Sequence, residues 1–260
     1  MPHEFRLLST GFNSAAFNMG LDETLLHKVA QGSSLPVLRL YGWSPPAISL
    51  GYFQGLEEEV DVNACRTEGV DIVRRITGGG AVFHQNELTY SIVLPLTHPL
   101  TESNILDSYR TLCSGIVAGL DLLGIEAEFA PINDIVIQGR KISGNAQTRK
   151  QGCILQHGTI LIDVDPDLMF RLLKVPAEKN RGRLIADIKA RVTSLRQIQP
   201  EYASVPFEFL YTEAAHAMER GFAEALGLRL IPDEVKSEEL QEAVQRAQEK
   251  FGSWAWTSLR

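Results

Sequence analysis

Apolar positions along this chain follow two different periods. A spacing of three to four residues, typical of helices with one buried face, covers 14–30, 103–123, 207–226 and 237–250. Short apolar runs rich in β-branched and aromatic residues, which predict strands, cover 36–43, 47–53, 70–75, 88–94 and 153–164. The pattern therefore predicts a chain in which helices and strands are mixed from end to end.

The residues between the predicted strands indicate how the strands connect. Ser44-Pro45-Pro46 separates the first two strands, which we expect to pair, and 134–144 predicts a hairpin that turns at Gln138-Gly139. Because short turns join most strands, we expect an α+β fold with a central mixed or antiparallel sheet flanked by helices. Pro166 predicts the start of a helix over 166–173, and the basic stretch 179–191 predicts a mobile surface loop.

Length and composition narrow the class of protein. The 260 residues are 44% apolar and 22% charged, ordinary values for a folded soluble protein, and the length allows one large domain or two small ones. No apolar run is long enough to span a bilayer, and the three cysteines are too few for a disulfide framework, so we expect a cytoplasmic protein. A net charge of −7 argues against a nucleic-acid partner.

The stretch "RRITGGGAVFH" (74–84) concentrates positive charge and glycine at one turn. Three glycines indicate positive φ or a close backbone approach, and successive N–H groups beside arginine suit a phosphate or an acyl-phosphate. The motif is neither a Walker loop nor a dinucleotide fingerprint, because the following residues and the spacing differ. The alternative is a flexible hairpin turn with no ligand.

Two further stretches carry candidate chemistry. In "NDIVIQGRKISGNAQ" (133–147), Lys141 lies beside a tight turn among polar side chains, where its charge could stabilise an oxyanion; alternatively it is a solvated surface lysine. In "LQHGTIL" (155–161), a His-Gly-Thr interrupts an apolar strand, which indicates a close backbone approach or else a bulge with a core histidine.

In this order, the three stretches resemble the catalytic domain of the biotin/lipoate protein ligase family, near its lipoate–protein ligase A and octanoyltransferase branches. The likeness begins near "FNMGLDETLL" (17–26) and reaches "EKFGSWAW" (249–256). It implies a single α+β catalytic domain over 1–260, with C-terminal helices at 207–250 packed on it and a cleft for a medium-chain acyl group.

The resemblance also implies roles for individual residues. Lys141 matches the family lysine that contacts the reacting carboxyl or acyl-phosphate, and Asp134 falls where the family approaches Mg²⁺. The residues implied to bind the nucleotide or acyl-adenylate are Arg74, Arg75, Gly78, Gly79, Gly80, Ala81, Val82, Phe83, His84, Asn133, Asp134, Gly144, Gln147, His157, Gly158 and Thr159.

The leading interpretation is a lipoate–protein ligase. Such an enzyme joins lipoate or octanoate to ATP in the presence of Mg²⁺ and passes the acyl group to a lysine of a lipoyl-carrier domain, of the 2-oxoacid dehydrogenase E2 or glycine cleavage H protein type. Larger ligases of this family add a C-terminal accessory domain, and this chain ends soon after Trp256. The resemblance therefore implies either a separate accessory subunit or an enzyme that accepts preformed acyl-adenylate.

Two alternatives stay open. One is an ATP-independent octanoyl or lipoyl transferase that moves the acyl group from a carrier protein through a cysteine thioester. In the resembling transferases that cysteine precedes the segment equivalent to "NDIVIQGRK", where this chain has none, so Cys153 is the candidate nucleophile; "FHQNELTYSIV" favours this branch. The other alternative is a non-catalytic acyl-adenylate-binding module.

Overall fold

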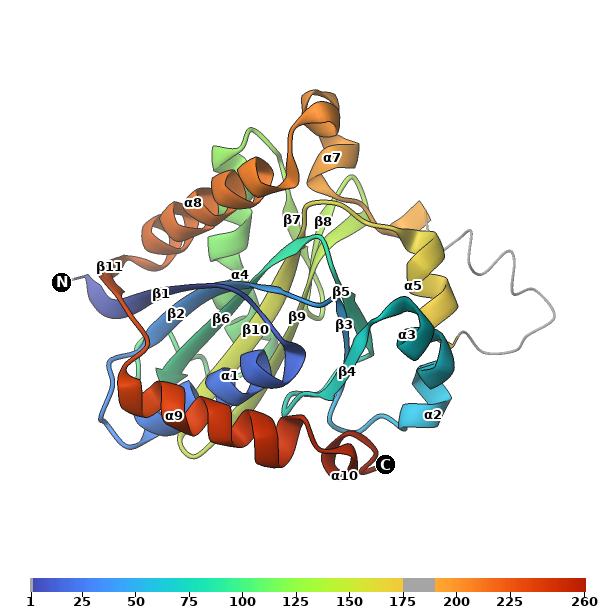
Figure 1. Cartoon of the computed structure of the whole chain (residues 1–260). Coiled ribbons are helices and arrows are strands. Elements are labelled where there is room, and N and C mark those ends of the chain that lie inside the picture. The colour runs from blue at the N-terminus through green and yellow to red at the C-terminus, as the bar shows by residue number, and fades with distance from the viewer. Residues whose placement is uncertain (1, 175–189) are drawn as a thin grey trace.

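The computed structural model describes residues 2–174 and 190–260, and a large mixed sheet organises them (Figure 1). Its strand order is β11-β1-β2-β6-β10-β9-β8-β7. β1 pairs in parallel with both β11 and β2, whereas the pairs from β2 to β7 are antiparallel. In chain order the strands are β1 (His3–Asn13), β2 (Val37–Trp43), β6 (Glu87–Pro95), β7 (Glu128–Ala130), β8 (Asp134–Ile137), β9 (Arg140–Lys150), β10 (Cys153–Leu161) and β11 (Leu228–Asp233).

A second, three-stranded sheet lies beside the large one. Its order is β4 (Asp71–Arg74), β3 (Ala47–Leu50) and β5 (Val82–His84). The expected pairing of 36–43 with 47–53 is therefore wrong, because the turn at Ser44-Pro45-Pro46 carries the chain from one sheet to the other. β2 pairs with β1 and β6, while β3 pairs with β4 and β5.

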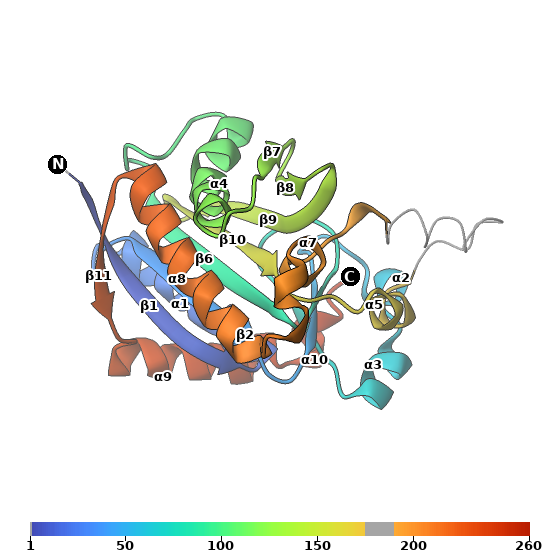
Figure 2. The ribbon, with the colours of Figure 1, turned by 90° about the horizontal axis from the view of Figure 1, so that it is seen from above.

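Helices cover both faces of the large sheet (Figures 1 and 2). α1 (Ala15–Ala30), α9 (Ser237–Arg246) and η2 (Ala247–Phe251) lie on one face, and α4 (Ile105–Leu122) and α8 (Phe207–Leu226) pack together on the other. The shorter helices are α2 (Leu56–Glu59), α3 (Val62–Glu68), α5 (Pro166–Leu172), α7 (Leu195–Ile198), η1 (Pro200–Ser204) and α10 (Trp254–Thr257). None of the described helices is long and apolar enough to cross a membrane.

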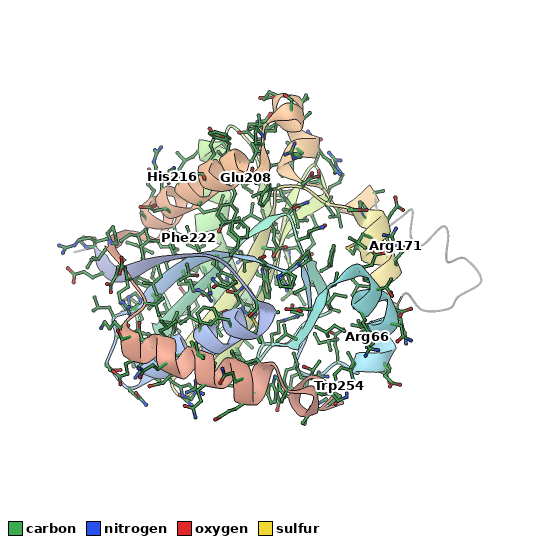
Figure 3. All side chains as sticks on the ribbon, in the orientation of Figure 1. Arg66, Arg171, Glu208, His216, Phe222 and Trp254 are labelled. Carbon is green, nitrogen blue, oxygen red and sulfur yellow. The ribbon has the colours of Figure 1, made fainter. Side chains whose placement is uncertain are left out.

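Three apolar clusters correspond to these layers. One fills the space between the large sheet and α4/α8, the second lies under α1 and α9, and the third lies between the small sheet and the α2–α3 segment. On α8, Phe222 is fully buried, whereas His216 is exposed on the outer side of the same helix (Figure 3). Gly221 lets α8 approach α4 closely, because a Cβ there would lie 2.3 Å from the backbone nitrogen of Gly119.

The α+β class, the mixed sheet and the flanking helices are confirmed. The hairpin at Gln138-Gly139 is also confirmed, and both residues have positive φ. β1 and β11, which form the edge beyond β2, have no counterpart among the predicted strands. The predicted loop over 179–191 lies outside the described residues except for its last two positions.

Candidate active site

An inner cavity of about 150 Å³ opens where the two sheets meet. Its apolar wall includes Met19 of α1, Tyr41 and Trp43 of β2, and Ala81 and Val82 at the start of β5. Its polar wall includes Ser49, Arg75, Gly79, Gly80, His84, Thr89, Asn133, Lys141, Gly144, Asn145, His157, Gly158 and Thr159. The cavity thus gathers the three stretches that the sequence singled out.

An outer cavity lies next to the inner one. The residues lining both are Gly80, Ala81, Val82, Lys141, Gly144 and Thr159. Phe83, Glu87 and Asp134 line the outer cavity but not the inner one. A substrate could therefore place its tail in the inner cavity and still be reached from the outer one at this junction.

Lys141 is a partly exposed cation among the residues that line both cavities. Its side chain is 41% exposed, and Nζ lies 2.7 Å from Asp134 Oδ1. Gly144 leaves room for this arrangement, because a Cβ there would lie 2.6 Å from Lys141 Cε and Nζ. The carboxylate holds the ammonium at the residues that line both cavities.

Arg75 is fully committed to internal acceptors. Nε donates to Thr77 Oγ1, one terminal nitrogen donates to Ser49 O and Oγ, and the other donates to Gly78 O and Gly80 O, at 2.7 to 3.1 Å. These contacts match the five N–H donors of a guanidinium. Burial lowers the pKa of Arg75 to about 10, so the group remains a cation at neutral pH. Arg75 therefore fixes the glycine turn and has no donor left for a phosphate.

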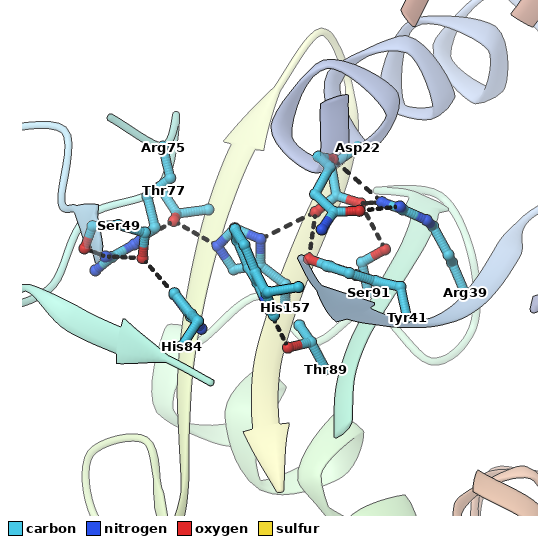
Figure 4. Close-up of polar contacts among 12 residues, drawn as sticks. Asp22, Arg39, Tyr41, Ser49, Arg75, Thr77, His84, Thr89, Ser91 and His157 are labelled. Carbon is cyan, nitrogen blue, oxygen red and sulfur yellow. Dashed lines mark hydrogen bonds and ion pairs between the residues drawn. The ribbon is translucent and has the colours of Figure 1, made fainter. Parts of the chain in front are cut away.

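Two chains of hydrogen bonds converge on Arg75, and each runs from a carboxylate through a histidine to a hydroxyl (Figure 4). In the first, Asp22 Oδ2 contacts His157 Nδ1 at 3.1 Å, and His157 Nε2 contacts Thr77 Oγ1 at 2.8 Å. Asp22 comes from α1 and forms a buried ion pair with Arg39, with Nη1 and Oδ1 at 2.8 Å. The chain links the N-terminal helix to the glycine turn.

The second chain begins at Glu87. Its Oε1 lies 2.6 Å from His84 Nδ1, and His84 Nε2 lies 2.7 Å from Ser49 Oγ. Trp43 stacks on the His84 ring with centroids 4.0 Å apart. Because Arg75 donates to Ser49 Oγ, the serine hydrogen is free to be donated to His84, which leaves the His84 Nδ1–H for Glu87.

Arg74 has a purely structural position. Its guanidinium donates to backbone carbonyls of Gly51, Gln54 and Thr257, which ties the start of the glycine turn to the C-terminal segment. It lines neither cavity. With both arginines engaged and Asp134 paired to Lys141, the predicted phosphate and Mg²⁺ contacts do not fit these residues.

The structure brings together most of the residues implied by the resemblance, but not all of them. Of the three consecutive glycines only Gly79 has positive φ, at 96°. Gly78 and Gln147 line neither cavity, and Gln147 instead contacts Ser108 and Gln156.

Cys153 does not lie at the cavities. It is 1% exposed, belongs to the apolar cluster under α1, and lies four residues from His157 along β10, about 13 Å in an extended strand. Burial raises the pKa of the Cys153 thiol, and burial raises the pKa of Cys65 to about 11 and that of Cys113 to about 12. These environments disfavour the thiolate that a nucleophile requires.

Sequence reasoning missed several residues of the site. Asp22 lies within the quoted "FNMGLDETLL", and Glu87 within "FHQNELTYS", but neither pattern shows which carboxylate is buried. The other missed residues are Met19, Arg39, Tyr41, Trp43, Ser49, Thr77, Thr89 and Asn145. A charged residue on the apolar side of a predicted helix, as at Asp22, was the available signal.

Comparison with known proteins identifies the class of protein: an enzyme of the family that includes lipoate–protein ligases and octanoyltransferases. The model of the lipoyl protein ligase A/B catalytic domain matches residues 14–218, and the chain belongs to this family. An octanoyltransferase LipM of Kyrpidia tusciae is 41% identical over 93% of this chain and 94% of its own length. One of Geobacillus kaustophilus is 36% identical over 98% of both chains.

Solved structures agree on the fold. A bi-partite lipoate protein ligase of Thermoplasma acidophilum, described with its E2 lipoyl domain, superposes with a TM-score of 0.86 at 29% identity and covers 99% of this chain and 98% of its own. A lipoate–protein ligase A bound with ATP gives 0.80 at 27% identity over 99% of each chain.

These relatives correct the leading interpretation of the sequence. The curated relatives, at 31–41% identity over nearly full length, are octanoyltransferases, so the expectation of an ATP-dependent ligase is wrong. The accessory subunit was expected because it would assist adenylate formation. Since the ligase interpretation is wrong, there is no longer a reason to expect this subunit. Membership of an enzyme family also removes the basis for a non-catalytic binding module.

The buried Asp22–His157 pair predicts a loss of stability in acid. Burial lowers the pKa of His157 below 6.5, although the neighbouring Asp22 opposes this shift. Burial alone would raise the pKa of Asp22, but His157 and Arg39 outweigh it and the pKa of Asp22 is lowered. Below about pH 6.5 the unfolded chain therefore binds a proton at residue 157 that the folded protein does not, and the free energy of unfolding should fall. Urea unfolding between about pH 5 and 8 gives the free energy of unfolding of the wild type and of His157→Gln at each pH. We expect the wild type to lose more of this free energy in acid than the variant, and an equal pH dependence of the two proteins would contradict the prediction.

Proposed function

We propose that this protein transfers an octanoyl group, or a closely related medium-chain acyl group, from the thioester of a carrier protein to a lysine of a lipoyl domain, without ATP. The names of the curated relatives support this activity, and the neighbour described with its E2 lipoyl domain supports the acceptor. The E2 and H-protein types are both candidate acceptors. We further propose that residues 1–260 act as a single catalytic domain in the cytoplasm.

The observation that carries the proposal is the meeting of two cavities at Lys141. The inner cavity has an apolar wall of Met19, Tyr41 and Trp43, which suits an acyl tail. A tail seated there brings its carbonyl to the junction, and the outer cavity gives a second molecule access to it. Transfer between two carriers needs this arrangement.

In the proposed reaction, Lys141 stabilises negative charge on the acyl oxygen. When the lysine amine attacks the thioester carbonyl, the carbonyl oxygen gains charge, and an ammonium held by Asp134 at its edge can neutralise it without reorganisation. Arg75 contributes indirectly, because it holds the turn that includes Gly79 and Gly80 against the inner cavity. Both carriers bring their own reacting groups to this place.

The choice of donor tests the proposal. Purified protein and an apo-lipoyl domain are incubated either with octanoyl carrier protein alone or with octanoate or lipoate plus ATP and Mg²⁺, and the lipoyl domain is weighed by mass spectrometry. We expect rapid acylation with the carrier protein and no ATP requirement. Acylation that occurs only with the free acid and ATP would refute the proposed function.

Lys141→Ala tests the junction. Loss of a positioned group at a developing oxyanion should reduce kcat by about 10²- to 10³-fold. The thermal midpoint should stay close to that of the wild type, because the Lys141 side chain is 41% exposed. Lys150→Ala is the matched control, since Lys150 is an exposed lysine of the same strand. Equal rates for both variants would remove Lys141 from the reaction.

Cys153→Ser tests the thioester route. Because Cys153 is buried away from both cavities, we expect the variant to keep acyl transfer within about twofold of wild type, a change of about 0.4 kcal/mol in the barrier. Steady-state transfer from octanoyl carrier protein measures it, together with mass spectrometry of the quenched enzyme. A hydroxylamine-labile adduct that forms on the wild type and disappears in Cys153→Ser would contradict this.

A further inference from the structure

Glu87 combines deep burial with an unused acceptor atom. The residue is 1% exposed at the start of β6. Its Oε1 is close to two donors, His84 Nδ1 at 2.6 Å and Thr89 Oγ1 at 2.7 Å. Its Oε2 is buried and has no hydrogen-bond partner among the residues that the structure describes. A buried carboxylate oxygen without a donor is costly, so this atom points to a ligand that supplies one.

The position of Glu87 limits what that ligand can be. Glu87 lines the outer cavity, and β6 pairs with β10 so that Glu87 is opposite Leu161 and Thr89 is opposite Thr159. Thr159 in turn lines both cavities at the junction. Glu87 and Thr159 therefore line the outer cavity from neighbouring strands, two positions apart in register, so a group bound in this cavity can reach both.

Surrounding contacts hold the carboxylate in one orientation. Trp43 Nε1 donates to Thr89 Oγ1 at 2.8 Å, so the Thr89 hydrogen is directed to Glu87. The stacking of Trp43 on His84 fixes the other donor. The neighbouring carboxylate, Asp134, is already paired with Lys141. Glu87 thus keeps one carboxylate oxygen without a partner among the described residues, in an orientation fixed by the contacts of the other.

We propose that Glu87 Oε2 receives the ammonium group of the target lysine and removes its proton, so that Glu87 is the catalytic base of the acyl transfer. This inference rests on the proposed function. A lysine ammonium offers three N–H donors, and a carboxylate accepts only, so the two are complementary. A base is required because an unperturbed lysine, with a pKa of about 10.4, is protonated at neutral pH and cannot attack.

Glu87 Oε2 takes one proton from the ammonium, and the freed electron pair forms the C–N bond to the acyl carbon. The oxyanion beside Lys141 then collapses, the C–S bond breaks, and the second amine proton passes to the departing sulfur, which leaves as a thiol. The amide keeps one N–H, and Glu87 releases its proton to solvent.

Glu87→Gln tests this assignment with two nucleophiles. Octanoyl carrier protein is the donor, and the acceptor is either an apo-lipoyl domain or hydroxylamine, which is uncharged at neutral pH and needs no base; the uncatalysed reaction is subtracted. We expect transfer to lysine to fall by about 10²- to 10⁴-fold and transfer to hydroxylamine to fall far less. The remaining lysine reaction should rise about tenfold per pH unit, because it then depends on free amine.

The controls separate the possible failures. Glu57→Gln makes the same chemical change on an exposed carboxylate and should leave both rates unchanged. Glu87→Asp covers the case in which Glu87→Gln does not fold, and it should show the same selective loss to a smaller degree. Equal loss with both nucleophiles, or a higher KM for the carrier protein alone, would overturn the role of Glu87. If the wild type fails to acylate lysine from octanoyl carrier protein, the proposed function itself fails.

Discussion

The site depends on the buried guanidinium of Arg75. A cation removed from water must have its donors satisfied, and here backbone carbonyls of β3 and of the glycine turn, together with two hydroxyls, satisfy them. Each hydroxyl is held by a histidine, and each histidine by a carboxylate, Asp22 or Glu87. The glycine turn, the N-terminal helix and the start of β6 are therefore fixed relative to one another.

Because of this constraint, the positive charge of the glycine turn has a structural function and not a phosphate-binding one. Two adjacent arginines at a glycine run are typical of phosphate binding, but Arg74 and Arg75 give their donors to the protein itself. Lys141 remains the cation that extends into the shared opening of the cavities. A single positioned ammonium suits one developing oxyanion, as acyl transfer from a thioester requires, better than a polyphosphate.

The sequence predicted the elements whose pattern is strong. The stripe on 103–123 and the turn at Gln138-Gly139 are local signals, and α4 and the β8–β9 hairpin follow them. β1 and β11 were missed because β1 gains its stability from parallel partners far along the chain, which no local period reveals. The pairing of β3 with β4 and β5 was missed for the same reason.

The candidate site was predicted in part. The three motifs converge because β10 and β9 are neighbours and the glycine turn lies beside both, so Lys141, His157 and Gly79 share one cavity. The sequence could not show that the arginines are satisfied internally, since hydrogen bonding over such separations depends on the tertiary fold. It also could not place Cys153. This residue is near His157 in the sequence, but its side chain is buried in the apolar cluster under α1 and lines neither cavity.

A crystal structure with an unreactive ketone analogue of an octanoyl thioester tests the central claim most directly. We predict that the alkyl chain fills the inner cavity against Met19 and Trp43, and that the ketone oxygen lies about 3 Å from Lys141 Nζ. An alkyl chain bound elsewhere, with the ketone out of reach of Lys141 and the inner cavity empty, would contradict it.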